Sequence, residues 1–297
     1  MNGRHSDDAA ALAATRLAFG SHSREWSGNR YVYPVVSRRS GGLSIGINLN
    51  PDKICNFDCI YCSVDRRVPG QAGRVSPGEV RTELRRMLAL AASGAIFRLP
   101  GFSSIRPELM RINDIAFSGD GEPTTCPEFG RCCRIAAEEL QAVGLSAVKL
   151  VLITNATMFG RRPVRDALEY LDQHGGEIWA KLDAGTAAYY QLVNRPGVGF
   201  ARILRNITWC ARVRPTVIQT LLMRIGGQSP GPEEILAYTQ RLAEIMAVGG
   251  RIKLVQLYTV ARHTAESYVT PLPAEEITAI SKRVKQLLPG VPVECFW

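Results

Sequence analysis

Short apolar runs alternate along the chain with longer segments in which apolar residues recur at the 3.6-residue period of a helix. The pattern starts at Leu43 and repeats six times. Because the runs are continuously apolar, they indicate a parallel sheet covered by helices on its outer face. We therefore predict an α/β fold, a partial (β/α)6 barrel of the TIM type. The expected strands are Leu43–Leu49, Ile112–Phe117, Val148–Ile153, Ile178–Leu182, Val217–Met223 and Ile252–Tyr258.

A helix with an apolar stripe follows each expected strand, after a long loop in the case of the fourth strand. The first helix opens at Ser76-Pro77-Gly78-Glu79, a capping box with proline at the first helical position. The stripes consist of Val80, Leu84, Met87 and Leu88; Phe129, Cys133, Ala136 and Leu140; Val164, Leu168 and Leu171; Phe200, Ile203, Ile207 and Cys210; Ile235, Leu242 and Ile245; and Ile277, Ile280, Val284 and Leu287.

The repeating pattern sets the domain organisation. We expect residues 1–42 to form an N-terminal extension whose early part, rich in glycine and serine, is mobile. We expect residues 43–297 to form one domain that contains the barrel, a C-terminal helix and a packing tail over Val293–Trp297. With 297 residues and 46% hydrophobic content, the chain can bury one large core.

Composition favours the cytoplasm. No apolar stretch approaches the roughly twenty residues of a membrane span, so we expect no membrane contact. The N-terminus lacks a secretory apolar core with a cleavage site. The eight cysteines, three of them in one short loop, suit a reducing compartment better than a disulfide framework.

The net charge of +9 favours a polyanionic partner, with nucleic acid as the first candidate. The arginines are nevertheless scattered, and no basic block is interleaved with aromatic residues. Solvated helix faces account for most of them. The paired arginines are Arg38-Arg39, Arg66-Arg67, Arg85-Arg86 and Arg161-Arg162.

Three cysteines with CxxxCxxC spacing, Cys55, Cys59 and Cys62, carry the strongest chemical signal. Their thiolates can bind three irons of a [4Fe-4S] cluster and leave the fourth iron without a protein ligand. A structural zinc site needs four ligands, and no histidine lies close in the sequence. A ferredoxin loop would supply a fourth cysteine soon afterwards, yet the next is Cys126. The loop is too polar for three unligated core cysteines.

The remaining cysteines give weaker signals. Cys132 and Cys133 lie on the helix stripe that faces the sheet, which favours packing over a second cluster. Cys126 follows a glycine-rich turn and is expected near the mouth of a pocket.

Loops of unusual composition follow the strand ends, where ligands bind in parallel α/β folds. The turn Gly119–Thr124 contains glycines that permit close backbone approach, and Glu122 can accept hydrogen bonds from a cationic amine. A tight loop alone would also explain these glycines. Asn155, Lys181 and Asp183 follow or end later strands, where capping of the loop is the alternative role.

The cysteine loop, with Tyr61 before its last cysteine, resembles the signature of the radical S-adenosylmethionine (SAM) superfamily, and the resemblance extends over about residues 31–260. It implies a partial barrel of the radical SAM kind and a [4Fe-4S] cluster bound by Cys55, Cys59 and Cys62. In this family the open iron chelates SAM, and one electron cleaves SAM to methionine and a 5'-deoxyadenosyl radical. A flavodoxin-type or ferredoxin-type donor would supply that electron.

The same resemblance implies the SAM contacts. Gly121 and Glu122 match the family's Gly-Gly-Glu motif, which holds the amino group of SAM, although Asp120 makes the local sequence Gly-Asp-Gly-Glu. Tyr61 is a further expected SAM contact, and Asn155 and Asp183 are expected contacts because of their positions at strand ends. Position alone also places Leu257–Val260, near the sixth strand, beside the adenine. Neither the residues nor the resemblance names a catalytic residue.

Residues Pro34–Leu49, together with the cysteine loop, resemble a subgroup placed with the wyosine-forming enzymes that modify tRNA. The chain departs from those enzymes in the residues around its cysteines and has no evident flavodoxin-like segment. We therefore expect a radical SAM enzyme that abstracts a hydrogen atom from its substrate, with an RNA (tRNA) base as the first candidate. A small metabolite or a peptide is the alternative substrate. A non-catalytic iron-sulfur or zinc protein that binds RNA or regulates a partner is a further alternative.

Overall fold

The computed structural model describes residues 26–297. Its strands are β1 (Val32–Ser37), β2 (Gly42–Ile47), β3 (Ile112–Phe117), β4 (Lys149–Thr154), β5 (Gly176–Lys181), β6 (Thr216–Ile225), β7 (Ile252–Thr259), β8 (Val269–Pro271) and β9 (Val293–Phe296). Its α-helices are α2 (Pro77–Ala92), α3 (Phe129–Ala142), α4 (Arg162–Gln173), α5 (Ala187–Asn194), α6 (Phe200–Val213), α7 (Pro232–Ala247) and α8 (Ala274–Leu287). Short 3-10 helices are η1 (Ala95–Arg98), η2 (Pro107–Leu109) and η3 (Pro123–Thr125).

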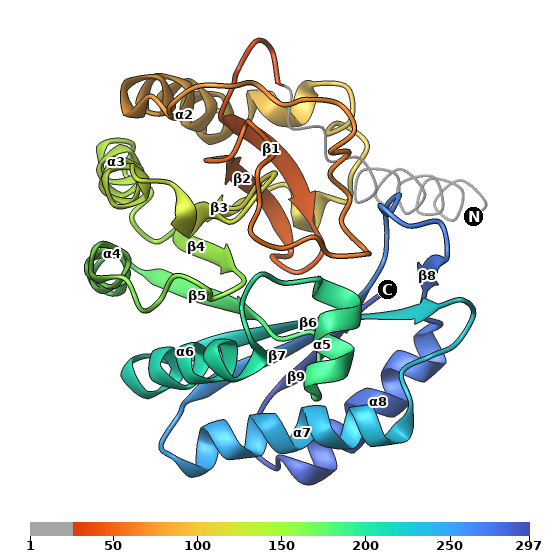
Figure 1. Ribbon diagram of the computed structural model, residues 1–297. Helices are drawn as coiled ribbons and strands as arrows, with labels where there is room; N and C mark the ends of the chain where they lie inside the picture. Colours follow the sequence, from red (N-terminus) through yellow and green to blue (C-terminus); the bar gives the residue numbers. More distant parts are fainter. Residues whose placement is uncertain (1–25) are drawn as a thin grey trace, which may run out of the picture.

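The strands form a curled sheet in the order β1-β2-β3-β4-β5-β6-β7-β9, and β8 adds to β6. Strands β2 to β7 are parallel, β9 is parallel to β7, and β1 is antiparallel to β2. Figure 1 shows α2, α3, α4, α6, α7 and α8 ranged along the outer side of this sheet. The predicted α/β partial barrel is confirmed.

Burial explains why the strands read as continuous apolar runs. In the described chain the main core lies between the sheet and the helices, and most expected stripe residues belong to it, as Leu84, Leu168 and Ile207 illustrate with no exposed area. On the last helix, Ile280 is only partly buried and Leu287 is 49% exposed, contrary to the expectation. A smaller cluster of Ala116, Val151, Trp179 and Val217 covers the inner face. Strands packed on both faces cannot alternate apolar and polar residues.

Three elements differ from the expectation. Val32–Ser37, which the sequence leaves in the extension, forms the edge strand β1. The long loop after the fourth strand contains the helix α5. The tail forms strand β9 along β7 rather than a packing segment alone. The expected mobile early part of the extension lies outside the described residues.

Half of the predicted capping box of α2 is present. The Ser76 hydroxyl accepts a hydrogen bond from the Glu79 backbone N–H. The Ser76 backbone N–H donates to the Tyr31 hydroxyl at 3.2 Å, so that a residue next to β1 takes the place of the reciprocal Glu79 contact. A hydrogen bond between residues far apart in the sequence therefore replaces one of the two local bonds of the capping box.

Glu83 attaches the start of β1 to helix α2. Its buried carboxylate accepts hydrogen bonds from the backbone N–H groups of Arg30, Tyr31 and Val32 at 2.8, 2.8 and 2.9 Å. Three charge-assisted bonds to one carboxylate satisfy backbone donors that have no ladder partner. The antiparallel edge strand is thereby held in place.

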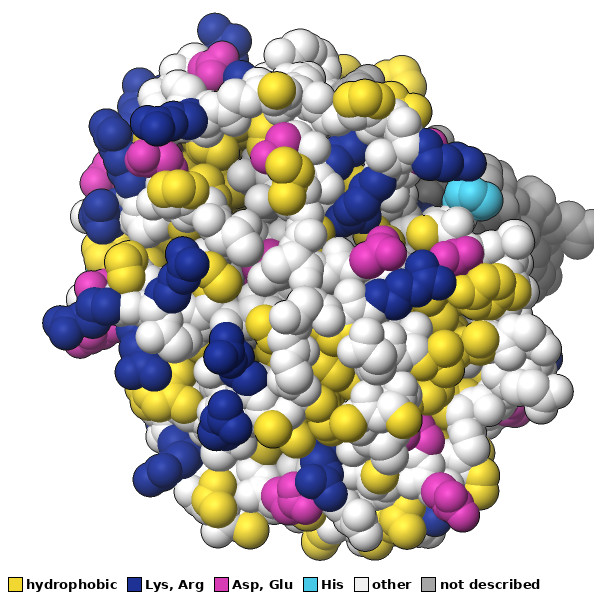
Figure 2. Space-filling model, in the orientation of Figure 1, with side chains coloured by type: hydrophobic (Ala, Val, Ile, Leu, Met, Phe, Trp, Pro, Cys, Tyr) yellow, Lys and Arg dark blue, Asp and Glu magenta, His cyan; other side chains and the backbone are white. Residues whose placement is uncertain are grey.

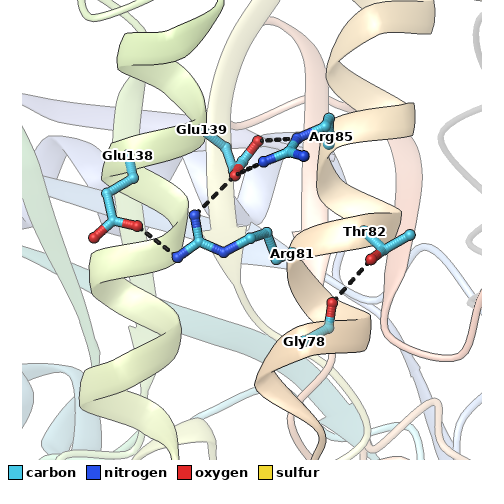
Figure 3. Close-up of polar contacts among 6 residues, drawn as sticks. All are labelled: Gly78, Arg81, Thr82, Arg85, Glu138 and Glu139. Atoms are coloured by element: carbon cyan, nitrogen blue, oxygen red, sulfur yellow. Dashed lines mark hydrogen bonds and ion pairs between the residues drawn. The ribbon is translucent and has the colours of Figure 1, made fainter.

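An ion-pair network joins helices α2 and α3 on the outer face (Figure 3). Glu139 accepts hydrogen bonds from Arg81 at 3.0 Å and from two nitrogens of Arg85 at 2.9 Å. Arg81 also reaches Glu138 at 2.5 Å. The Glu139 side chain is only 2% exposed, whereas the guanidinium groups remain partly solvated.

Among the described helices, none is long and apolar enough to cross a membrane.

We predict that Glu139→Gln lowers the free energy of unfolding by about 2 kcal/mol at neutral pH. Hydrogen bonds from Arg85 and Arg81 hold the pKa of Glu139 below its ordinary value. The stabilisation is therefore fully present above the pH where an unfolded glutamate titrates, about 4.3, and is lost as pH falls through the lowered pKa. Urea unfolding of the apoprotein at neutral and acidic pH measures the difference. Glu138→Gln, at a half-exposed position, is the control, and an equal loss at both pH values would contradict the prediction.

Candidate functional site

The loops after β2, β3 and β4 and the end of β5 line one cleft of about 250 Å³ at the carboxyl ends of the strands. Seven of the eight expected site residues line it, the exception being Asp183. The seven are Cys55, Cys59, Tyr61, Cys62, Gly121, Glu122 and Asn155. Residues far apart in the sequence thus converge at the place that the strand ends predict.

The cysteine loop is anchored to the end of helix α5. The backbone N–H groups of Asp58 and Ile60 donate to the carbonyls of Asn194 and Val193 at 3.1 and 3.0 Å. Within the loop, the Cys62 N–H donates to the Cys59 carbonyl at 3.0 Å. All three thiols are partly exposed and form no disulfide.

Two side chains direct N–H groups at the sulfurs. Arg66 donates to Cys62 Sγ at 2.9 Å, and the Asn194 amide approaches Cys59 Sγ at 3.4 Å. Burial raises the pKa of Cys59 to about 11, so binding of metal must displace a proton from this thiol. Three soft sulfur donors facing a cleft, with N–H donors to stabilise thiolate charge, fit a [4Fe-4S] cluster.

No group of three or more His, Cys, Asp or Glu side chains is spaced to hold a single metal ion in the described part of the chain. A four-iron cluster makes a different demand, because each thiolate binds a different iron. Cys132 and Cys133 are fully buried in the helix core, and Cys126 does not line the cleft.

Glycine is required in the turn after β3 because the cysteine loop packs against it. A Cβ at Gly121 would lie 2.2 Å from the Ile54 carbonyl oxygen, and one at Gly119 would lie 2.2 Å from Asn48 Oδ1. The close approach is therefore to a neighbouring loop, in addition to any approach to a ligand. The two loops can meet only if these positions lack side chains.

Glu122 is the centre of the hydrogen bonds that join the loops. Its Oε1 accepts from the Thr124 backbone at 3.2 Å, from the Thr124 hydroxyl, and from the Thr154 hydroxyl at 2.6 Å. Its Oε2 accepts from the Asn155 backbone at 2.7 Å. Burial raises the pKa of Glu122, and the hydrogen bonds oppose that shift. Because Oε2 has a single partner, it retains one acceptor position at the cleft.

Asn155 extends this connection to the cysteine loop. Its amide donates to Asn56 Oδ1 at 2.8 Å, and its own Oδ1 accepts from the Thr157 backbone and hydroxyl at 3.1 and 2.7 Å. The loop-capping role is thus observed, and Asn155 also borders the cleft.

Tyr61 lines the cleft with its ring, while its hydroxyl is fixed behind it. The hydroxyl donates to Asp183 and accepts from Lys181 and Asn194 at 2.7 and 3.1 Å. Asp183 also accepts from the Leu221 backbone at 2.9 Å. Asp183 therefore orients Tyr61 and Lys181 and does not itself border the cleft.

Lys181 is a partly buried cation of the cleft. Burial alone would lower the pKa of Lys181, but the Asp183 carboxylate offsets this effect and the pKa lies above its ordinary value. Its ammonium lies 3.6 Å from Asp183 and 4.5 Å from the Tyr61 ring centroid.

Tyr258 of the expected adenine-flanking segment also lines the cleft, whereas Thr259 and Val260 line a neighbouring pocket.

The sequence analysis missed Arg66, Asn194 and Asn48. Arg66 follows Cys62 by four residues, and this proximity was the available signal. Asn194 lies at the end of helix α5, in a segment that the sequence predicts to be a loop. Asn48, at the end of β2, accepts from the Asp120 backbone and donates to its carboxylate at 3.1 and 2.6 Å. These contacts span long sequence distances, so local pattern does not reveal them.

A family model described as the Radical SAM superfamily matches residues 49–238. The chain belongs to the radical SAM superfamily. The match includes the cysteine loop and strands β3 to β6. The cofactors of this enzyme superfamily, a [4Fe-4S] cluster and SAM, are therefore those of this chain.

Curated relatives are distant. The UPF0026 protein MJ1312 of Methanocaldococcus jannaschii is 24% identical over 257 residues, which cover 83% of this chain and 68% of that protein. The GTPase Obg of Brachyspira hyodysenteriae is 24% identical over 260 residues, which cover 85% of this chain. The chain spans 33% of that second relative.

Solved structures share the fold. Streptococcus suis SuiB bound to its precursor peptide SuiA has a TM-score of 0.57 and 12% identity, and the match covers 85% of this chain and 48% of SuiB. TYW1 with a lysine-pyruvate adduct has a TM-score of 0.51 and 15% identity, and the match covers 91% of this chain and 80% of TYW1. At such identities the likeness concerns the fold alone.

We predict that Glu122→Gln lowers the free energy of unfolding of the apoprotein by about 1–3 kcal/mol. The new NH2 group points either at the Asn155 N–H or at the three donors that now bond to Oε1. In both orientations a donor faces a donor and hydrogen bonds are lost. Chemical denaturation measures the loss, and faster hydrogen exchange at residues 154–157 locates it. Glu128→Gln, at a partly exposed position beside the same turn, is the control. Unchanged exchange at 154–157 would contradict the assigned role.

Proposed function

We propose that Cys55, Cys59 and Cys62 bind the [4Fe-4S] cluster and that the cleft beside them binds SAM. When bound, these cofactors supply reductive cleavage of SAM to methionine and a 5'-deoxyadenosyl radical, which abstracts a hydrogen atom from the substrate. The convergence of the three cysteines with the Gly121-Glu122 turn in one cleft supports the proposal.

The chain's own residues position and shield the reactants. Arg66 and Asn194 stabilise thiolate charge, as N–H donors to sulfur do in iron-sulfur sites. Glu122 offers its remaining acceptor position to the amino group of SAM, with Gly121 beside it. Tyr61 and Asn155 border the same space, and Asp183 acts through Tyr61 and Lys181. The apolar inner face, with Ile153 and Trp179, restricts water.

For the substrate we propose an RNA base, with tRNA as the first candidate. The net charge of +9 supports a polyanion. The observation that carries the proposal is helix α6, which contains no carboxylate and exposes Arg202, Arg205 and Arg212. None of these three has a carboxylate at ion-pair distance among the described residues.

Folding brings further arginines, at the start of α4, beside α6. Arg161 and Arg162 are at the start of α4, and the Arg165 guanidinium lies 4.3 Å from the ring centroid of Trp209 on α6. Figure 2 shows Lys and Arg side chains gathered over α4 and α6. Helices that follow parallel strands start at the edge where the cleft lies, so this surface leads to the cleft. A basic surface interleaved with an aromatic ring suits a nucleic-acid backbone.

An electron donor of the flavodoxin or ferredoxin type is the proposed redox partner. The thiols Cys55, Cys59 and Cys62 are partly exposed, which allows a donor protein to approach the cluster from outside.

We expect Cys59→Ala to abolish the cluster and SAM cleavage together. The test is anaerobic reconstitution with iron and sulfide, reduction with dithionite in the presence of SAM, and chromatographic detection of 5'-deoxyadenosine. Cys126→Ala, outside the cleft, should retain both the visible absorbance and the product. Undiminished cleavage by the Cys59→Ala protein would refute the assignment.

We predict that the triple variant R202E/R205E/R212E binds tRNA at least tenfold more weakly than the wild type. Each lost phosphate contact should also reduce the slope of log affinity against log salt by about 0.7–0.9. Fluorescence anisotropy at several salt concentrations measures both effects. The matched control is K282E/R283E/K285E on α8, which changes the charge equally on another helix. An equal loss in the two variants would leave α6 without a specific role, and no tRNA binding by the wild type would direct the search to metabolites and peptides.

A further inference from the structure

The open side of the half-barrel is bordered by cations. In the described sheet, the free edges are β1 and β9. The turn between β1 and β2 carries Arg38 and Arg39, and the Arg39 guanidinium carbon lies 4.5 Å from the ring centroid of Tyr258 at the end of β7. The arginine turn thus reaches from the β1 border of the sheet to β7, the strand next to the opposite border strand β9.

A side pocket lies at this meeting point. It is lined by Ser37, Arg38, Arg39, Tyr61, Ser63, Leu221, Tyr258, Thr259, Val260, Ala261 and Arg262. Arg39, Tyr61, Tyr258 and Arg262 also line the main cleft, so the two spaces are continuous. The side pocket therefore connects the interior of the barrel with its open side.

Among the described residues, three arginines and no carboxylate line this pocket. Several arginines elsewhere in the described chain are paired with carboxylates, for example Arg67 with Asp65 and Arg195 with Glu266. No carboxylate lies at ion-pair distance from Arg38 or Arg39 among the described residues. Burial and the neighbouring Arg39 lower the pKa of Arg38, and a bound anion would act in the opposite direction.

The contact with Tyr258 leaves the Arg39 N–H groups available. A guanidinium over an aromatic ring uses its face, whereas its N–H edge binds oxygen anions in a bidentate manner. Arginine matches the geometry of phosphate better than lysine does. Two adjacent arginines on a short turn can bind the oxygens of a single phosphate group.

We propose that Arg38 and Arg39, at the open side between the β1–β2 turn and the end of β7, bind a phosphate group of the substrate. The proposal deepens the proposed function and rests on it for the reaction that follows. The phosphate belongs either to an RNA backbone or to a phosphorylated small molecule. In both cases it would fix the substrate at the rim and direct the neighbouring group into the cleft.

The test compares R38Q/R39Q with the control R67Q/R86Q, which removes the same charge from two exposed arginines. The probes are radiolabelled inorganic phosphate in equilibrium dialysis and a short stem-loop RNA in fluorescence anisotropy. We expect R38Q/R39Q to bind phosphate about tenfold more weakly, while the control stays within about twofold of the wild type. Circular dichroism and the absorbance of the reconstituted cluster verify that each variant is folded.

The RNA probe distinguishes the two sources of phosphate. Parallel loss of phosphate and RNA affinity supports the site with an RNA backbone as its ligand. Loss of phosphate affinity with unchanged RNA affinity supports the site with a phosphorylated small molecule. Unchanged phosphate affinity in R38Q/R39Q, or no phosphate binding by the wild type, would overturn the proposal. The proposed function is judged separately, by SAM cleavage and tRNA binding of the wild type.

Discussion

Where parallel strands end inside a protein, their last backbone groups lose the ladder partners that the sheet supplied, and each buried group needs another. Side chains from neighbouring strand ends meet this need. Glu122 accepts the Asn155 N–H, Asn48 accepts the Asp120 N–H, and Asp183 accepts the Leu221 N–H. Because each bond crosses from one strand end to the next, the shape of the cleft depends on it. The fold must make these bonds whether or not a cofactor is bound.

Two residues, Arg66 and Asn194, connect these strand-end hydrogen bonds to the cysteine sulfurs. Arg66 donates to Cys62 Sγ and, with its other terminal nitrogen, to the Asp120 carbonyl at 2.9 Å. Asn194 approaches Cys59 Sγ and also bonds Asp183 at 3.0 Å. The cysteine loop is therefore braced by the turn after β3 and by the group around Asp183. A change in either place moves a thiol, so the three cysteines cannot be understood as a local motif alone.

The sequence predicts those features whose cause is local or periodic. Strands packed on both faces must be continuously apolar, so the parallel sheet can be predicted from the sequence. The three cysteines lie within one loop, so their spacing alone predicts the cluster site. Strand β1 was missed because Pro34 and its position at the sheet edge weaken the strand pattern. Helix α5 has only eight residues, and β9 has four. Asp183 was expected in the cleft because it follows a strand. The carboxylate instead bonds Tyr61 and the Leu221 backbone, partners that only tertiary structure brings near.

The charged side chains discussed above fall into two groups, those paired with an opposite charge and those without such a partner. Inside the half-barrel, Lys181 lies beside Asp183, and Glu177 accepts from Lys253 at 2.6 Å. Such pairs offset the cost of burying charge, so little of their charge is available to a ligand. Arg38, Arg39 and the exposed arginines of α6 lack such partners among the described residues. Their unpaired charge adds repulsion to the compact state and is available to an anionic ligand. The anionic part of the substrate is therefore best sought at the rim and its reacting part within the cleft.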